Sequence, residues 1–216
     1  MTTDAKICGI KTRDALDAAI GGGAQYVGLV FFAPSPRNVN IPTAAELARQ
    51  ARGRAKVVAL VVDADDAALA EIAEKVKPDF FQLHGKETAE RVAAIKTRFD
   101  IPLIKAIAVE TAHDAEVARA YVGIADLILF DAKSPKGSVL PGGNGLAFDW
   151  HALADVSQDM HFMLSGGLRP ETVAEAIRLT GAKAVDVSSG VESAPGVKDA
   201  QLIRSFLHAV KTAKQT

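Results

Sequence analysis

The sequence has little of what several protein classes require. Its 216 residues include one cysteine, Cys8, which excludes an internal disulfide framework, and no Cys/His spacing resembles a zinc site. The net charge of -1 offers no basic excess for nucleic acid, and no stretch approaches the roughly 18 apolar residues of a membrane span. The N-terminus lacks a basic region followed by a long apolar run. We therefore expect a cytoplasmic protein that binds neither nucleic acid nor a membrane.

What the sequence does contain is a repeated alternation of apolar runs and amphipathic segments. Hydrophobic residues make up 49% of the chain, enough for a substantial core. Apolar runs typical of buried parallel strands begin near positions 6, 26, 56, 79, 102, 125, 161 and 184, with helical patterns between them. Eight such units without a linker predict an α/β protein, a TIM (β/α)8 barrel forming one domain over residues 1–216. An open doubly wound sheet usually has fewer strands.

The last two predicted strands each end in a turn of small residues. The turns are Gly166-Gly167 after the seventh strand and Ser188-Ser189-Gly190 after the eighth. Glycine lets a backbone approach a ligand closely, and consecutive N–H groups at a helix start attract an anion. Such turns can also serve only to reverse the chain. Two of them at these positions match the phosphate site of a TIM barrel, so we expect them to bind a phosphate.

Two irregular segments interrupt the alternation. Residues 33–42 contain three prolines that oppose regular pairing, and residues 132–147 form a glycine- and proline-rich stretch after the sixth strand. Loops of this length in a compact domain tend to be functional, so we interpret residues 132–147 as an active-site lid. Asp63, by contrast, precedes a helical pattern over residues 64–76 and is expected to cap that helix.

Active sites of such barrels lie at the carboxyl ends of the strands, which makes the residues at those ends the candidates for chemistry. Cys8 ends the first strand and Asp131 the sixth, so one can serve as a base and the other as an acid. A thiol becomes a competent base where nearby cations or N–H groups lower its pKa. Arg37 offers a fork suited to a carboxylate, and His84 either lines the ligand or satisfies a backbone group.

Several motifs, in this order and at these spacings, closely resemble those of the phosphoribosylanthranilate isomerases, enzymes of tryptophan biosynthesis. The resemblance extends from about Lys6 to Phe206. The motifs are KICGI at residues 6–10, VFF with SPR at residues 30–32 and 35–37, QLHG at residues 82–85, GGNG at residues 142–145 leading to FDW at residues 148–150, SGGL at residues 165–168, and VDVSSGVE at residues 185–192.

The resemblance implies an Amadori rearrangement, without metal or cofactor, of N-(5-phosphoribosyl)anthranilate to 1-(2-carboxyphenylamino)-1-deoxyribulose 5-phosphate. It implies that Cys8 is the general base and Asp131 the general acid, and that Arg37 holds the anthranilate carboxylate. Asp186 would bind the sugar hydroxyls, with His84 beside the substrate. The phosphate would be bound by Gly143, Gly145, Gly166, Gly167, Ser188, Ser189 and Gly190. Asn144 and Ser165 depart from residues common in the family, which bears on loop contacts and not on the reaction class.

Two other functions compete with this one. The histidine-pathway isomerase performs the same rearrangement on a substrate with two phosphates, but it has a carboxylate where Cys8 stands and needs a second phosphate site in the first half of the chain. A barrel that only binds a phosphometabolite would have no need of an acid and a base. We therefore expect a phosphosugar substrate, and the sequence leaves open whether the protein is a monomer or a homodimer.

Overall fold

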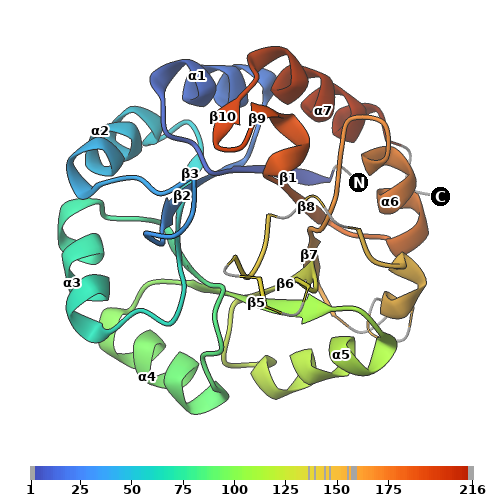
Figure 1. The fold of residues 1–216 in the computed structure, drawn as a ribbon. Helices are drawn as coiled ribbons and strands as arrows, with labels where there is room; N and C mark the ends of the chain where they lie inside the picture. Colours follow the sequence, from blue (N-terminus) through green and yellow to red (C-terminus); the bar gives the residue numbers. More distant parts are fainter. Residues whose placement is uncertain are drawn as a thin grey trace.

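The computed structural model describes residues 3–135, 137–138, 140–143, 145, 147–154, 156 and 160–213. Eight parallel strands form a closed barrel in chain order, and helices surround it (Figure 1). The eighth strand pairs with the first, with Lys6 opposite Asp186. The TIM barrel expected from the sequence is thereby confirmed. No helix in the described part of the chain combines the length and apolar character needed to cross a membrane.

The barrel strands lie close to the positions that the apolar runs predict. They are β1 (Asp4–Cys8), β2 (Tyr26–Phe31), β3 (Lys56–Val61), β4 (Phe80–Leu83), β5 (Leu103–Val109), β6 (Leu127–Ala132), β7 (Phe162–Leu164) and β8 (Ala184–Val187).

The helices between them begin at polar caps. Thr12, Asn40, Asp65, Thr88 and Asp199 each accept a backbone N–H from the first turn of the helix that follows, as good N-cap residues do. The helices are α1 (Arg13–Gly22), α2 (Ile41–Ala51), α3 (Asp66–Lys75), α4 (Ala89–Phe99), α5 (Ala112–Glu116), α6 (Val173–Thr180) and α7 (Ala200–Thr212), with 3-10 helices η1 (Val117–Tyr121), η2 (Trp150–Leu153) and η3 (Ser189–Val191).

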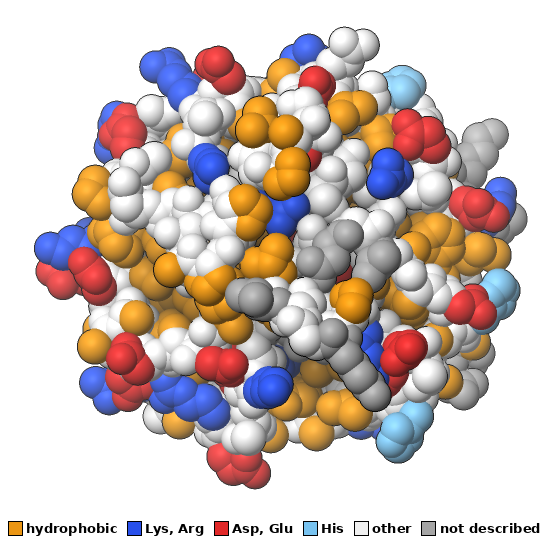
Figure 2. Space-filling model, in the orientation of Figure 1, with side chains coloured by type: hydrophobic (Ala, Val, Ile, Leu, Met, Phe, Trp, Pro, Cys, Tyr) orange, Lys and Arg blue, Asp and Glu red, His pale blue; other side chains and the backbone are white. Residues whose placement is uncertain are grey.

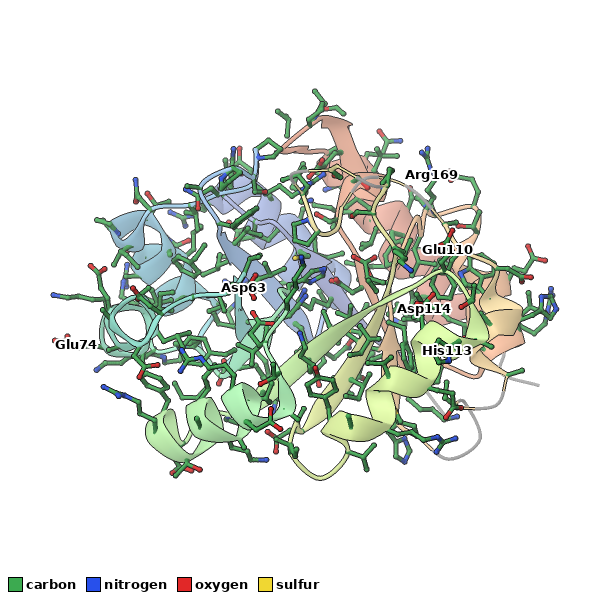
Figure 3. All side chains as sticks on the ribbon, turned by 60° about the horizontal axis from the view of Figure 1, so that its bottom comes forward. Asp63, Glu74, Glu110, His113, Asp114 and Arg169 are labelled. Carbon is green, nitrogen blue, oxygen red and sulfur yellow. The ribbon has the colours of Figure 1, made fainter. Side chains whose placement is uncertain are left out.

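Residues 112–121 form the short helix α5 followed by the 3-10 helix η1, and α6 begins at Val173. One expectation about local structure was wrong. Asp63 does not cap α3, because Asp65 does. Asp63 instead adopts a φ of 48° and accepts the backbone N–H of Lys86, which ties the end of β3 to the end of β4. Figure 3 places Asp63 across the barrel from Arg169.

The sequence patterns also missed a small hairpin after β8. It consists of β9 (Glu192–Ala194) and β10 (Val197–Lys198), which pair in antiparallel fashion. A two-residue strand is too short to show an alternation, so local pattern could not reveal it. The hairpin brings Glu192 and Lys198 to the mouth of the barrel.

The interior of the barrel changes character along its axis. The part farther from the carboxyl ends of the strands is apolar, with Val58, Ile104, Leu129 and Met163 in one buried cluster. Toward the carboxyl ends of the strands the buried side chains become polar and include Lys6, Gln82, Asp131, Ser165 and Asp186. Burying polar groups costs free energy unless they are paired, so such a concentration marks a functional end of the barrel.

Candidate active site

A pocket opens at the carboxyl ends of the strands, and every residue that the sequence proposed for the site lines it. Cys8, Arg37, His84, Asp131 and Asp186 contribute side chains. The glycines and serines proposed for the phosphate are also there, namely Gly143, Gly145, Gly166, Gly167, Ser188, Ser189 and Gly190. Figure 2 looks onto this face, where charged side chains ring the edge and hydrophobic and uncharged groups occupy much of the centre. Asn144 lies outside the described residues.

Cys8 lies beside a buried ion pair. Lys6 precedes it by two residues, so both side chains point into the barrel, and Lys6 Nζ lies 2.9 Å from Asp186 Oδ1. The Lys6 side chain is fully buried, and its charge acts on the Cys8 thiol. Burial opposes the charge of Lys6, but Asp186 and Cys8 outweigh it, so that the pKa of Lys6 is raised. Lys6 is therefore a cation next to the thiol.

The pKa of the Cys8 thiol is raised in the structure, whereas a thiol that acts as a base was expected to have a lowered pKa. Burial raises the pKa of Cys8 above its ordinary value; Lys6 and Lys198 pull it down, and Asp186 adds to the rise. In the ligand-free pocket the thiol form therefore dominates near neutral pH. Space around the sulfur is tight as well, because a Cβ on Gly28 of β2 would stand 2.9 Å from Cys8 Sγ.

Asp131, one residue before the end of β6, lies across the mouth and has two close polar neighbours. Its Oδ1 accepts the backbone N–H of Ala132 at 2.9 Å, and its Oδ2 lies 3.2 Å from His84 Nε2. His84 in turn contacts Gln82 through Nδ1 at 2.9 Å. The loop after β6 lies over this pair, since a Cβ on Gly142 would collide with both Asp131 Oδ2 and His84 Nε2. Glycine at 142 lets the backbone cover the carboxyl group closely.

Arg37 is held in place by the hairpin that follows β8. Its guanidinium makes two hydrogen bonds to the carboxylate of Glu192, each 2.9 Å long, and a third of 3.2 Å to the carbonyl of Gly143. Lys198 Nζ lies 2.6 Å from Glu192 Oε1. Burial would raise the pKa of Glu192, but Arg37 and Lys198 lower it overall, so Glu192 is a carboxylate. The bidentate pair fixes the plane of the arginine fork.

The two small-residue turns meet at one edge of the pocket. Gly166 and Gly167 have φ angles of 90° and 65°, which side chains rarely tolerate. A Cβ on Gly190 would collide with the carbonyl of Leu168, so the second turn packs directly against the first. Gly145 completes this edge, because a Cβ there would lie 3.7 Å from Ser189 Oγ. The turns therefore present backbone to one common space.

Comparison with known proteins decides the family. The model of the N-(5'phosphoribosyl)anthranilate (PRA) isomerase family matches residues 5–209. The chain belongs to this family. A relative from Rhodopseudomonas palustris, an N-(5'-phosphoribosyl)anthranilate isomerase, is 55% identical over 215 residues, covering 100% of this chain and 99% of its own. One from Brucella canis is 53% identical, covering 99% and 96%. The chain is thus a PRA isomerase by family, an enzyme of tryptophan biosynthesis, as the sequence motifs predicted.

Solved structures of the PRA isomerase family share the architecture. The Thermotoga maritima phosphoribosyl anthranilate isomerase is 33% identical and superposes with a TM-score of 0.88, covering 97% of this chain and 99% of its own. Another, at 32% identity and a TM-score of 0.85 with the same coverage, is described as a complex with reduced 1-(o-carboxyphenylamino)-1-deoxyribulose 5-phosphate. A third, also from Thermotoga maritima with the same identity, TM-score and coverage, is described as monomers generated from a dimeric isomerase.

Four buried polar residues at the site were not singled out by the sequence argument for a PRA isomerase. Lys6 and Gln82 lie on strands, within motifs that carried the resemblance but in which they were given no role, and Glu192 and Lys198 lie on the unforeseen hairpin. The signal available for the first two was a polar residue at an inward-facing strand position. No local signal existed for Glu192 and Lys198, because their hairpin reaches the loop after β2, which contains Arg37, only when the barrel closes.

Proposed function

We propose that Cys8 and Asp131 catalyse an Amadori rearrangement of N-(5-phosphoribosyl)anthranilate. Asp131 gives its proton to the ribose ring oxygen, the bond from C1 to that oxygen breaks, and the anthranilate nitrogen lone pair forms a protonated Schiff base at C1. The Cys8 thiolate then removes the proton from C2, and those electrons form the C1–C2 double bond of an enolamine. The ketone product forms when C1 gains a proton and the C2 hydroxyl loses one, so no atom is gained or lost overall.

The observation that carries this proposal is the facing of an acid and a base across one pocket. Cys8 ends β1 and Asp131 is one residue before the end of β6, and both line the pocket that the two glycine turns border. General acid–base catalysis requires both groups within reach of one substrate, and proton transfer contributes about 10²–10⁴-fold for each positioned group. A barrel that only stored a phosphosugar would have no reason to bury a carboxyl and a thiol opposite each other.

Lys6 makes the base step feasible. The thiol must lose its proton before it can take one from C2, and the ammonium group next to it favours the thiolate. Asp186 keeps Lys6 charged and in position, and we propose that it also receives the sugar hydroxyls. One carboxylate would thereby connect substrate binding to the cation beside the base.

Arg37 and the turns would bind the two anionic ends of the substrate. The guanidinium has one edge on Glu192 and lines the pocket, so its remaining N–H groups suit the anthranilate carboxylate. The phosphate would bind backbone N–H groups of the Gly166-Gly167 and Ser188-Ser189-Gly190 turns, with Gly145 beside them. Gly143 contributes its carbonyl to Arg37 and thus lies toward the carboxylate end. The ligand in the solved complex of the family carries both a carboxylate and a phosphate, which supports a site that accepts two anions.

A fluorescence assay with freshly made phosphoribosylanthranilate tests the assignment. We expect Cys8→Ser and Asp131→Asn each to lower kcat by at least about 100-fold with little change in KM, since each removes one proton-transfer group. Asp63→Asn is the matched control, because it alters a carboxylate at a strand end outside the acid–base pair and should retain kcat within about twofold. A Cys8→Ser enzyme within about threefold of the unaltered protein would remove Cys8 from the mechanism.

The same assay distinguishes the rival substrate. The histidine-pathway compound carries a second phosphate. The loop after β2, which contains Arg37 and several prolines, has no glycine turn that could bind it. We expect a clear rate on phosphoribosylanthranilate and a far lower one on the two-phosphate substrate. Equal rates on both would overturn the specificity proposed here.

A further inference from the structure

Gln82 occupies a place in the barrel interior where the neighbouring strands supply aliphatic side chains. Its register partners are Leu60 on β3 and Ile104 on β5, and its side chain is fully buried. Gln82 Nε2 donates to His84 Nδ1 at 2.9 Å, while Gln82 Oε1 is buried and finds no hydrogen-bond partner among the described residues. An unpaired buried acceptor costs stability, which an aliphatic residue at this position would avoid.

The hydrogen bond from Gln82 limits where His84 can carry its proton. A neutral imidazole has one N–H and one acceptor nitrogen, and an imidazolium has two N–H groups. Since the amide donates to Nδ1, that nitrogen is the acceptor and the proton lies on Nε2. Nε2 is the atom 3.2 Å from Asp131 Oδ2, so the N–H group of His84 is the one nearest the carboxylate. Protonation at Nδ1 would set two donors against each other.

We propose that Gln82 is a positioning residue that holds His84 neutral, with its proton on Nε2, so that a fixed donor faces Asp131. The inference rests on the proposed role of Asp131 as the general acid. When Asp131 releases its proton to the substrate, the Nε2–H group stabilises the carboxylate that forms. A donor that is already oriented needs no rearrangement at that moment, which is how fixed dipoles aid catalysis. Gln82 is not among the described residues that line the pocket, and it acts through His84.

The amide of Gln82 could satisfy its own oxygen only by giving up this arrangement. Rotating the amide by half a turn would bring Oε1 to Nδ1, which must then carry the proton. Nε2 would be left as a bare acceptor against the Asp131 carboxylate, with a lone pair facing a negative charge. The observed orientation of the amide leaves Gln82 Oε1 unpaired, which lowers stability, but it keeps the proton of His84 on Nε2, where the proposed reaction needs it.

Nitrogen NMR of the histidine rings reads the protonation state without any assay of activity. The sequence has five histidines, and the His84 signals are identified by their loss in His84→Gln. At pH 7 we expect Nδ1 of His84 to be unprotonated and Nε2 protonated. In Gln82→Glu the new carboxylate accepts at Nδ1, so Nδ1 should gain a proton. A protonated Nδ1 in the unaltered protein, or an unprotonated Nδ1 in Gln82→Glu, would overturn the proposal.

Gln82→Met separates a positioning role from a purely structural one. Methionine is of similar size and removes both the donor and the unpaired oxygen, so the melting temperature should stay unchanged or rise. The kcat for phosphoribosylanthranilate should nevertheless fall about tenfold, with KM within about twofold, because the donor to Asp131 is no longer fixed. Ile104→Met, on the adjacent strand, is the matched control and should retain kcat within about twofold. A Gln82→Met enzyme with unchanged kcat would refute the role.

Failure of the acid assignment would look different. If Asp131→Asn kept the unaltered kcat while His84 showed the expected NMR pattern, Asp131 would not be the acid, and Gln82 would still set the protonation of His84. If Asp131→Asn lost activity while Gln82→Met kept it, the acid would stand and the inference about Gln82 would fall.

Discussion

Lys6 offers the sharpest test of how this site makes a base of a buried thiol. Replacing it by methionine removes the cation while keeping an unbranched side chain of similar length. Cys8 is then left near Asp186 without the opposing charge, and both effects favour the protonated thiol. We therefore expect Lys6→Met to raise the pKa of Cys8 beyond the rise that burial already causes, and to lower the share of thiolate at any fixed pH.

The size of the effect follows from Coulomb's law. Two unit charges about 4 Å apart at an effective dielectric constant of about 20 interact by about 4 kcal/mol, and a tenfold change in a proton equilibrium corresponds to about 1.4 kcal/mol. Asp186 lies 2.9 Å from Lys6 Nζ and already offsets part of that attraction. A residual of about 1.4 kcal/mol or more would reduce the thiolate population at a given pH at least tenfold, and kcat should fall by a similar factor.

The ultraviolet absorbance of the thiolate measures this directly. Cys8 is the only cysteine of the chain, so a pH titration reports on one group once the tyrosine signal is subtracted with Cys8→Ser. In the unaltered protein the signal should rise at a higher pH than for a free thiol, about 8.5, and in Lys6→Met at a higher pH still. The double variant Lys6→Met with Asp186→Asn removes the pair together and controls for a stranded buried charge. An unchanged or lower titration in Lys6→Met would refute the role of Lys6.

Three further predictions follow from the contacts in the pocket. Arg37→Ala should raise KM about 10- to 100-fold, because the contact to the substrate carboxylate is lost. Glu192→Gln only weakens the hydrogen bonds that hold that arginine and should raise KM less. If Arg37→Ala lowered the affinity for inorganic phosphate by the same factor, Arg37 would be a phosphate ligand. Gly167→Val forces a β-branched residue to a φ of 65° and should raise KM strongly in a steady-state assay, whereas Arg169→Ala should change it little. Gly28→Ala would place a Cβ against the catalytic thiol and should lower kcat at least about tenfold; an unchanged kcat would show that the thiol has room to move.

The barrel could be predicted from the sequence because its signal is repeated. Eight apolar runs at regular spacing are each weak, but a closed parallel sheet is the arrangement that buries all of them on both faces. The errors occurred where a single residue carried the argument. Asp63 looked like a cap because it precedes a helical pattern, yet its side chain accepts the N–H of Lys86 and leaves capping to Asp65. Two neighbouring carboxylates compete for one role, and sequence alone does not say which wins.

The candidate site could be predicted only in part, for a reason of geometry. Residues at strand ends are found by position, which is how Cys8 and Asp131 were identified; Asp186 came from the family resemblance, and all three line one pocket. The residues that control them lie one layer deeper or come from a hairpin distant in the sequence. Lys6 and Gln82 are two residues before Cys8 and His84, on the same face of their strands, so a rule that inspects that position would find both.

The charges at the mouth of the barrel bear on both the proposed acid, Asp131, and the proposed base, Cys8. Lys6 pairs with Asp186, and Arg37 and Lys198 share Glu192, so the surroundings of Cys8 hold a nearly balanced set of buried charges. The named groups carry one surplus positive charge, yet the pKa of Cys8 is raised, because the cost of burying a thiolate outweighs the attraction of Lys6 and Lys198. The proposed mechanism requires a thiolate at Cys8 and a carboxylic acid at Asp131. Moving one proton from the thiol to the carboxylate would produce that pair without changing the net charge of the site, so the two proposed groups can be prepared for catalysis together.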